Sequence, residues 1–251
     1  MPRIKETIFS RIFRKYIRKK MIKCINDSNK YFTISNIMKN EYYKLTNKES
    51  KIIMNMTESL YIPKEQLPKR NDNYIKFIYT GSLYYNRDKV IGLIAKAADI
   101  YNKDNNNTKK IKIEIYSNSE PSEEIKKNFE IKDCCEYCGS LTLNELKVKL
   151  NIADILIFVE SFEPEMKDKT KYSLSTKVPE YLSVGKPIFA VGPQNIGSME
   201  YLDKVAFCVY DERNIYNEMV KMLRENSKML KIADLARKKF EKCIKNNSLK
   251  E

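Results

Sequence analysis

The sequence of 251 residues predicts an α/β fold, a Rossmann-like parallel sheet with helices on both faces. Three observations predict it. From residue 74 onward, short apolar runs alternate with stretches of helical period, the order expected of strands joined by crossover helices. The runs at 155–159 and 188–191 are apolar throughout, which is typical of strands buried on both faces of a sheet. Connections long enough to hold a helix favour parallel strands with right-handed crossovers.

The first 57 residues are expected to be a remnant of a separate α/β domain. Residues 1–23 carry nine Lys or Arg against one acid, Glu6, and their apolar residues recur at helical spacing. These apolar residues are Ile4, Ile8, Phe9, Ile12, Phe13, Tyr16 and Ile17. Two interpretations stay open: a helix that lies on an anionic membrane surface, and a surface helix that packs its apolar stripe on a neighbouring domain.

The elements that follow define three parts. Strands are expected at 30–35 and 51–55, with a helix at 36–45 that begins at a Ser35 or Asn36 cap. Residues 58–73 hold two prolines and several charges with little periodicity, so an interdomain linker is expected there. The predicted parts are therefore 1–57, the linker at 58–73 and a larger domain at 74–251.

The larger domain is expected to alternate strands and helices to its end. Strands are expected at 75–79, 111–116, 134–138, 155–159, 188–191 and 206–210. Helices are expected at 89–101, 122–129, 143–151, 199–202, 214–224 and 228–244, with one more opening near residue 177. The charged stretch 160–171 is expected to be a loop.

The segment 172–193 predicts a loop, a short helix and a buried strand. Ser175 or Thr176 can cap the helix, and Gly185 suits a left-handed residue at its end. A loop that opens into a helix offers free backbone N–H groups to a phosphate. Glu180 lies one turn into the helix, where a carboxylate can accept hydrogen bonds from a ribose diol.

Composition limits the chemistry. The net charge of +14 would suit nucleic acid, anionic lipid or a phosphorylated substrate, and enrichment in Lys, Asn and Ile along the whole chain is an equally open explanation. The chain has no histidine, which removes Ser-His and Cys-His nucleophiles, so catalysis would depend on carboxylates, cations and substrate phosphates. Cys135 and Cys138 have a Cys-x-x-Cys spacing, but without a second pair or a histidine no metal site is expected.

Location is also predicted from composition. No run of apolar residues is long enough for a transmembrane helix, and the N-terminus lacks the apolar core of a signal peptide. A cytoplasmic protein with reduced cysteines is expected.

Ligands of an open parallel sheet bind beyond the carboxyl ends of its strands. Four loops qualify, at 81–82, 117–118, 160–176 and 192–193. Gly81 permits close backbone approach to a phosphate, and Arg87 can supply a bidentate cation. For Arg87 and Lys177 the alternative is a solvated surface charge. The glycine loop is neither a P-loop nor a Gly-x-Gly-x-x-Gly fingerprint.

The order of short motifs along residues 74–246 carries a family resemblance. The motifs are Tyr79-Thr80-Gly81-Ser82-Leu83, Ile115-Tyr116-Ser117, Gly139 with Glu145-Leu146, Ala153 to Ile157, and Lys177 to Pro187. In this order they resemble the donor half of GT-B glycosyltransferases, most closely the retaining group 1 family that uses nucleotide sugars. Residues 20–55 resemble the end of that family's first domain.

The resemblance implies a nucleotide-diphosphate sugar as substrate, with no further cofactor and no metal. It implies that Glu180 binds the ribose hydroxyls and that Ser175 and Thr176 face the pyrophosphate. Arg87 matches a cation that neutralises the leaving diphosphate, and Lys177 is a second candidate for that role. The resemblance also implies donor contacts from Gly81 and Ser82, with Tyr137 and Cys138 near the base.

Two departures from the family stand out. The family's first motif glutamate falls eight positions before Glu180, where Tyr172 stands, so this carboxylate is missing or comes from residues 160–165. The family's chains are also longer, with a full acceptor domain before the linker.

The leading hypothesis is a retaining, metal-independent glycosyltransferase of polysaccharide or glycolipid assembly, acting on a glycan or lipid-linked acceptor at the inner face of the membrane. The alternative is a non-catalytic nucleotide-sugar-binding fragment or subunit that needs a partner acceptor-domain chain. A third class, a basic nucleic-acid or membrane-binding protein, has no recognition motif in its support, and nucleic acid is not expected as a partner.

Overall fold

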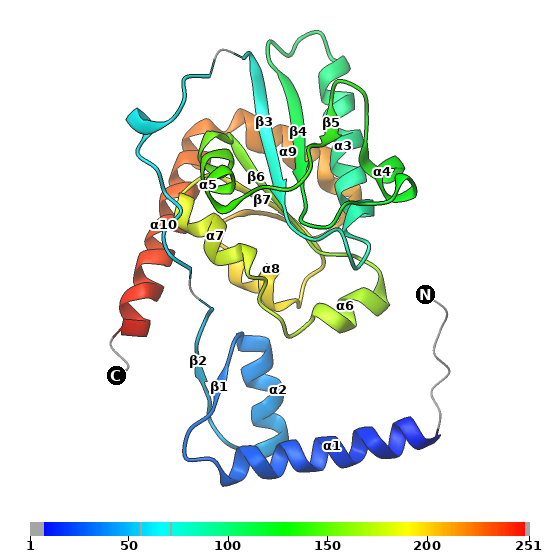
Figure 1. Ribbon diagram of the computed structural model, residues 1–251, viewed down its shortest axis with the longest axis vertical. Coiled ribbons are helices and arrows are strands. Elements are labelled where there is room, and N and C mark those ends of the chain that lie inside the picture. The colour runs from blue at the N-terminus through cyan, green and yellow to red at the C-terminus, as the bar shows by residue number, and fades with distance from the viewer. Residues whose placement is uncertain (1–7, 56, 71, 249–251) are drawn as a thin grey trace.

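The computed structural model describes residues 8–55, 57–70 and 72–248. It shows a large α/β domain joined to a small N-terminal unit (Figure 1). The large domain is built on a six-stranded parallel sheet with strand order β5-β4-β3-β6-β7-β8. The predicted Rossmann-like fold class is confirmed.

The strands are short and pair in parallel register from one end of the sheet to the other. They are β3 (Tyr74–Thr80), β4 (Lys110–Tyr116), β5 (Cys135–Tyr137), β6 (Ile155–Val159), β7 (Ile188–Val191) and β8 (Phe207–Val209). The two apolar runs noted in the sequence are β6 and β7, whose residues are all buried. They lie in the middle of the sheet, which explains why neither shows a polar face.

Helices cover both faces of the sheet, and each face has its own core. One core joins Phe77 and Ile157 to α3 (Arg87–Lys103), α4 (Glu123–Phe129) and α9 (Ile215–Arg224). The other core joins Ile78 and Leu156 to α5 (Leu143–Ile152), α7 (Lys177–Val184), α8 (Gly197–Leu202) and α10 (Asn226–Ser248). Neighbouring residues of one strand thus enter opposite cores, as the two-residue period of a strand requires.

The N-terminal unit contains α1 (Ile8–Asp27), β1 (Phe32–Thr33), α2 (Asn36–Thr46) and β2 (Lys51–Ile52). The predicted Ser35 cap is confirmed, because Ser35 Oγ accepts a hydrogen bond from the Met38 amide at 3.1 Å. Strands β1 and β2 pair only with each other among the described residues. They are shorter than predicted, since a two-stranded sheet gives little support to longer pairing.

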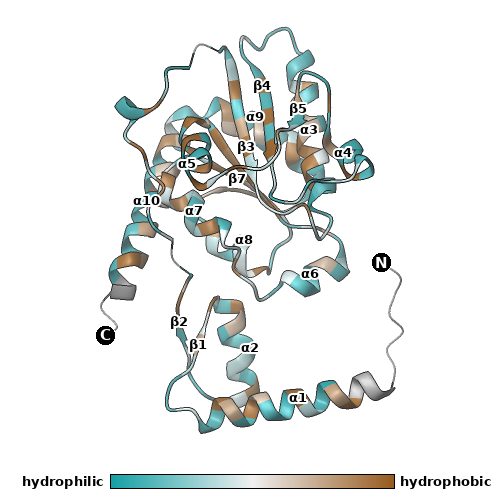
Figure 2. Ribbon diagram, in the orientation of Figure 1, coloured by the Kyte–Doolittle hydropathy of each residue, from teal (hydrophilic) through white to brown (hydrophobic). Residues whose placement is uncertain are grey.

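Helix α1 lies along the outer side of this unit and contacts α2 (Figure 1). Apolar and basic residues alternate along it (Figure 2). Ile12, Phe13, Tyr16 and Ile17 of the predicted stripe are between 49% and 61% exposed, while Ile4 lies outside the described residues. None of the helices in the described part of the chain combines the length and the apolar character that a membrane crossing requires.

The segment between the two parts is fixed against the large domain. The Leu60 amide donates to Ser183 Oγ at 3.1 Å, and the Ile62 amide donates to Asn151 Oδ1 at 2.9 Å. A short 3-10 turn, η1 (Lys64–Gln66), follows, and Arg70 is bonded to the Ile152 carbonyl. The described residues of the segment 58–73, which was predicted to be a linker, therefore form an ordered strap against the large domain.

One predicted loop is wrong. Within residues 160–171 the structure has a helix, α6 (Pro164–Thr170), which begins with a proline in its first turn. Proline is favoured there because the first turn needs no N–H donor and its φ is already helical. The sequence did not predict this helix because the stretch is highly charged and the helix buries only one residue.

Candidate functional site at the carboxyl edge of the sheet

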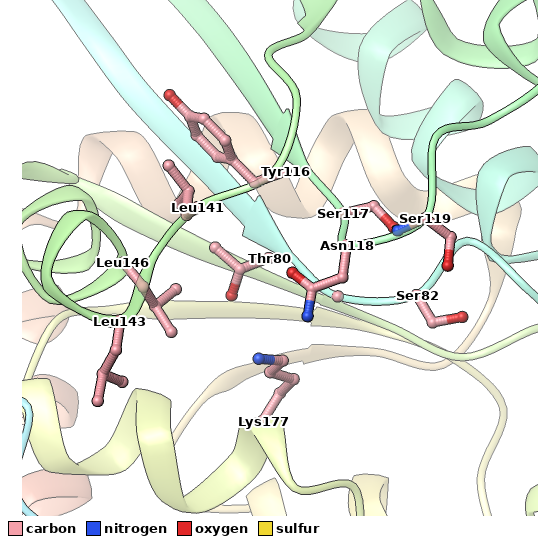
Figure 3. Close-up of a pocket in the computed structure, with 11 residues that line it drawn as sticks. Thr80, Ser82, Tyr116, Ser117, Asn118, Ser119, Leu141, Leu143, Leu146 and Lys177 are labelled. Atoms are coloured by element: carbon pink, nitrogen blue, oxygen red, sulfur yellow. The ribbon is translucent and has the colours of Figure 1, made fainter.

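A pocket of about 350 Å³ opens where β3 and β4 end, facing the starts of α5 and α7 (Figure 3). Its lining is polar on the strand side and apolar on the α5 side. The lining residues are Thr80, Gly81, Ser82, Tyr116, Ser117, Asn118, Ser119, Leu141, Leu143, Leu146 and Lys177. The size lies within the range of about 300–1,000 Å³ that is usual for small-molecule sites.

The loop after β3 is held in place by the neighbouring strand. The Gly81 amide donates to the Tyr116 carbonyl at 3.0 Å, which extends the β3–β4 ladder by one bond. Tyr79 donates its hydroxyl to the Ser82 carbonyl at 2.7 Å. The loop therefore has a fixed backbone, which suits a site that must meet a ligand without rearrangement.

Tyr181 joins this loop to α7. Its buried hydroxyl accepts from the Thr80 amide at 2.9 Å, and burial raises the pKa of Tyr181 to about 12. The hydroxyl therefore stays protonated at neutral pH. This hydrogen bond fixes the position of α7 relative to the end of β3.

The start of α7 presents a cation and a carboxylate one turn apart. Lys177 Nζ is 2.9 Å from Glu180 Oε2, and Lys177 lines the pocket. Thr176 holds the N-cap position but makes no side-chain cap bond, and the Ser175 hydroxyl accepts from the Lys177 amide at 3.3 Å. Gly185 ends the helix at φ +69°, as predicted.

A narrow second pocket of about 20 Å³ shares Thr80, Gly81, Ser82 and Lys177 with the first. Arg87 and Ser175 complete its polar lining. Two cations, a glycine loop and the start of a helix thus surround one small space. Each cation is also paired with a carboxylate, Arg87 with Glu160 and Lys177 with Glu180.

Arg87 forms an ion pair with Glu160, the residue that follows β6. One guanidinium nitrogen, Nη2, is 3.1 Å from both carboxylate oxygens of Glu160. Glu160 is 1% exposed, and this burial raises the pKa of its carboxyl group, with Arg87 opposing the rise. Glu163, three residues further along the chain, instead pairs with Lys89 and Asn86 at the surface.

The structure thus brings together most of the residues predicted for the site. Gly81, Ser82 and Lys177 line the larger pocket, and Arg87 and Ser175 line the narrow one. Glu180 is adjacent through its ion pair with Lys177. Thr176 lies at the helix start between Ser175 and Lys177.

Tyr137 and Cys138 lie at the end of β5, outside the described lining of both pockets. Tyr137 donates its hydroxyl to the Ser117 carbonyl at 3.2 Å, and burial raises the pKa of the Cys138 thiol. Through this hydrogen bond, Tyr137 supports the loop at 117–119 from the side of β5. The Ser117 amide in turn donates to the Gly139 carbonyl at 3.0 Å.

Tyr172, at the position of the family's first glutamate, also lies outside the described pocket linings. Its ring lies below Lys171 Nζ, 5.2 Å from the ring centre. Its carbonyl accepts from Ser35 Oγ at 3.0 Å, a contact that joins the N-terminal unit to the large domain. This residue therefore connects the two parts of the chain.

The apolar wall of the larger pocket was not predicted. Leu141, Leu143 and Leu146 come from the turn before α5 and from its first residues. Leu143 is 68% exposed, and this exposure, which the sequence does not record, is what marks the wall in the structure.

Among the described residues, no group of three or more His, Cys, Asp or Glu is arranged to hold a metal ion. The six cysteines are free thiols, and burial raises the pKa of Cys135.

A scan against models of protein families and a search of curated proteins each give no match. Solved structures do match. Sucrose-phosphate synthase from Thermosynechococcus elongatus aligns over 94% of this chain at 13% identity with a TM-score of 0.64. HepE from Anabaena in complex with UDP aligns over 94% at 12% identity with a TM-score of 0.71. A glycosyltransferase from Rickettsia africae aligns over 92% at 14% identity with a TM-score of 0.66.

These neighbours are GT-B glycosyltransferases, and the fold of this chain is that of one GT-B half with a partial second one. The chain spans 61% of the sucrose-phosphate synthase and 66% of the other two proteins. At identities of 12–14% the likeness extends to the fold.

Proposed function

We propose that this chain binds a nucleotide-diphosphate sugar at the carboxyl edge of its sheet and acts as a glycosyltransferase. The observation that carries the proposal is the joint lining of the two pockets. Gly81, Ser82 and Lys177 border both spaces, and Arg87 borders the narrow one. A diphosphate placed there would meet the cationic side chains of Arg87 and Lys177 in a fixed setting.

In this proposal each part of the donor has its own support. The base enters between Tyr116 and the Leu141–Leu146 wall, the ribose hydroxyls reach Glu180, and the diphosphate lies against Ser175, Thr176 and the glycine loop. Glu180 would exchange part of its bond with Lys177 for the ribose, which frees Lys177 to contact phosphate.

The proposed reaction is sugar transfer with retention and without a metal cofactor. Arg87 and Lys177 would stabilise the charge that develops on the leaving diphosphate, which is the role a metal serves elsewhere. Solved neighbours favour a uridine nucleotide: HepE is seen with UDP-glucose, and the pneumococcal transferase GtfA with UDP and GlcNAc. A glycan or lipid-linked acceptor, in polysaccharide or glycolipid assembly, completes the proposal.

A second candidate is a nucleotide-sugar-binding subunit that works with a separate acceptor-domain chain. The observation that favours it is the N-terminal unit, whose described strands are two residues each and whose α2 has no buried residue. Such a unit offers little surface for an acceptor. Turnover of donor by this chain alone would rule out the subunit alternative.

We also propose that the protein is cytoplasmic and peripheral at the inner face of the membrane. The stripe from Ile12 to Ile17 is exposed, and the same helix carries Arg14, Lys15, Arg18, Lys19 and Lys20. Basic flanks beside an apolar stripe suit an anionic lipid surface. Flotation with vesicles that contain phosphatidylglycerol should carry the protein, and the double variant Phe13→Asp/Ile17→Asp should stay behind. Equal flotation of both proteins would contradict this role of α1.

Thermal denaturation with UDP, GDP and their sugars tests donor binding. At ligand concentrations of about 100 times Kd, a stabilisation of about 2.7 kcal/mol is expected for the correct nucleotide. Glu180→Ala should reduce the shift, and Glu218→Ala, on the exposed part of α9, should leave it unchanged. If no nucleotide stabilises the wild-type protein, the donor-site proposal is wrong.

A further inference from the structure

A second large cavity lies at the opposite edge of the sheet, where β3, β6 and β7 begin. Its volume is about 630 Å³, larger than that of the pocket proposed for the donor. The strap of residues 61–70 forms one side, and the end of α7 and the start of α10 form the other. Nothing in the proposed transfer reaction uses it.

The cavity has an apolar interior. Aliphatic side chains come from every element that borders it: Ile62 and Leu67 from the strap, Val184 from α7, and Met229 and Leu230 from α10. Leu230 is 64% exposed, so part of this apolar surface is open to solvent. An open apolar cavity of this size is a binding surface for an apolar group rather than a packing defect.

Its rim is basic. Lys64, Lys69, Arg70 and Lys186 line the cavity against a single carboxylate, Asp154. That carboxylate is already bonded to Arg70, with Arg70 Nη1 2.8 Å from Asp154 Oδ2. The positive charge at the rim is therefore in excess.

Of the rim lysines, Lys64 and Lys69 are exposed, whereas Lys186 is partly buried. No hydrogen bond or ion pair to its ammonium group occurs within the described parts of the chain, although the residue is only partly exposed. Burial lowers the pKa of Lys186, Asp154 opposes that change, and Arg70 and Lys64 add to it. An anion in the cavity would compensate the desolvated charge.

The walls are held before any ligand arrives. Arg70 is fixed by the Ile152 carbonyl and Asp72, and the ring of Tyr61 lies 3.8 Å from the guanidinium of Arg237 on α10. Asn151 bonds the strap at the Leu60 carbonyl and the Ile62 amide. The cavity is thus preformed, which lowers the entropy cost of binding.

We propose that this cavity binds an amphiphilic anion, an unbranched aliphatic chain that carries a phosphate or carboxylate head. The chain would lie along Ile62, Val184 and Met229, and the head would reach Lys186 with Lys64 and Lys69 nearby. A lipid fragment and a free alkyl phosphate share this chemistry. The site is independent of the donor site, because the two lie at opposite edges of the sheet.

Calorimetric titration of the full chain with decyl phosphate, decanoate, decanol and inorganic phosphate tests the proposal, each below its micellar concentration. Saturable binding of decyl phosphate or decanoate is expected, with decanol and inorganic phosphate at least about tenfold weaker because each lacks one half of the recognised group. The stronger of the two anions identifies the head. Equal binding of decanol would show that charge recognition is absent and would overturn the proposal.

Two variants localise the site. Lys186→Gln should weaken decyl phosphate binding about tenfold, and Leu230→Glu, at an exposed position that folding does not need, should weaken it further by placing a carboxylate at the mouth. The control is Lys132→Gln, a substitution at an exposed lysine that does not line the cavity. Unchanged affinity in both cavity variants overturns the proposal.

Saturating UDP separates this test from that of the donor site. Decyl phosphate should bind equally with and without UDP and equally to Glu180→Ala. Competition by UDP would place the amphiphile in the donor pocket and so refute the second site.

Discussion

Glu160 and Arg87 form a buried ion pair beside the space proposed for the diphosphate. The carboxylate is almost completely buried, while the guanidinium keeps partial access to the narrow pocket. Burial of an ion pair costs desolvation free energy that Coulomb attraction only partly offsets. The pair is therefore weak evidence for stability, and it holds Arg87 at the lining of the narrow pocket.

The pH dependence of folding tests this electrostatic description. Burial raises the pKa of Glu160 in the folded protein above its ordinary value of 4.5. A carboxyl group with a raised folded pKa contributes stability below the unfolded pKa and loses it as the pH rises through the folded pKa. The free energy of unfolding of the wild type, relative to Glu160→Gln, should therefore fall as the pH rises above 4.5.

Urea unfolding over a pH series gives this difference directly. A difference that rises with pH would show that Arg87 lowers the pKa of Glu160 below its ordinary value, contrary to the expectation.

Lys177 allows the phosphate and ribose contributions to be separated. Lys177→Met should weaken UDP binding about tenfold or more, because a charge-assisted hydrogen bond to phosphate contributes about 1.5–3 kcal/mol. Uridine, which has no phosphate, should bind the variant and the wild type alike. Lys132→Met serves as the control, and equal losses for UDP and uridine would show that Lys177 acts only by holding Glu180.

At the scale of elements, the packing of α3 on α4 is tight at one residue. A Cβ atom at Gly92 would lie 2.1 Å from the Asn128 carbonyl oxygen, which belongs to the end of α4. The two helices approach this closely because Gly92 has no side chain. Helix α3 in turn carries Arg87 at its start, so its position bears on the site.

Gly92→Ala should therefore destabilise the protein by about 1–3 kcal/mol, through overpacking. The opposite sign, about 1 kcal/mol of stabilisation, is usual for Gly→Ala at an exposed helix position. Lys96→Ala, on the exposed side of the same helix, is the matched control and should change the free energy of unfolding by less than about 0.5 kcal/mol. Stabilisation by Gly92→Ala would contradict the described contact.

Elements with strong periodicity were predictable from the sequence, and those that depend on a distant partner were not. Strands β6 and β7 are uniformly apolar, so their positions were predicted to the residue. Helix α6 was missed because it buries only Thr170. The two-residue lengths of β1 and β2 depend on what lies beside them in space, which periodicity does not record.

The residues of the candidate site also fall into those that the sequence predicts and those that it does not. Residues that follow a strand directly, such as Gly81 and Ser82, were predictable because parallel strands end at a common edge. The leucines of α5 were not, since nothing in their spacing says that they face a loop after β4. The Arg87–Glu160 pair joins positions 73 apart, and only the fold brings them together.

At the scale of the whole molecule, the sheet has a pocket at each edge, and cations line both, although Arg87 and Lys177 are each paired with a carboxylate. The charge of +14 is therefore explained in part by local use, at Arg87 and Lys177 on one edge and at Lys186 on the other. The basic helix α1 adds a third positive surface. This distribution favours anionic ligands and an anionic lipid surface over a general attraction to polyanions.

At the junction between the two parts of the chain, α2 and the residue that caps it contact α8 and Tyr172. Ser35 meets Tyr172, and a Cβ atom at Gly197 would lie 3.1 Å from Ser35 Oγ. The pocket proposed for the donor does not include this junction, because its lining comes from the large domain alone.

Hydrogen exchange of the backbone amides, with and without saturating UDP, tests the central claim most directly. Binding at the carboxyl edge predicts slower exchange in the peptides that cover residues 80–82, 117–119 and 175–178. The strap at 61–70 should exchange at the same rate in both states. Protection confined to the strap, or to the N-terminal unit, would contradict the account, as would exchange that UDP leaves unchanged throughout.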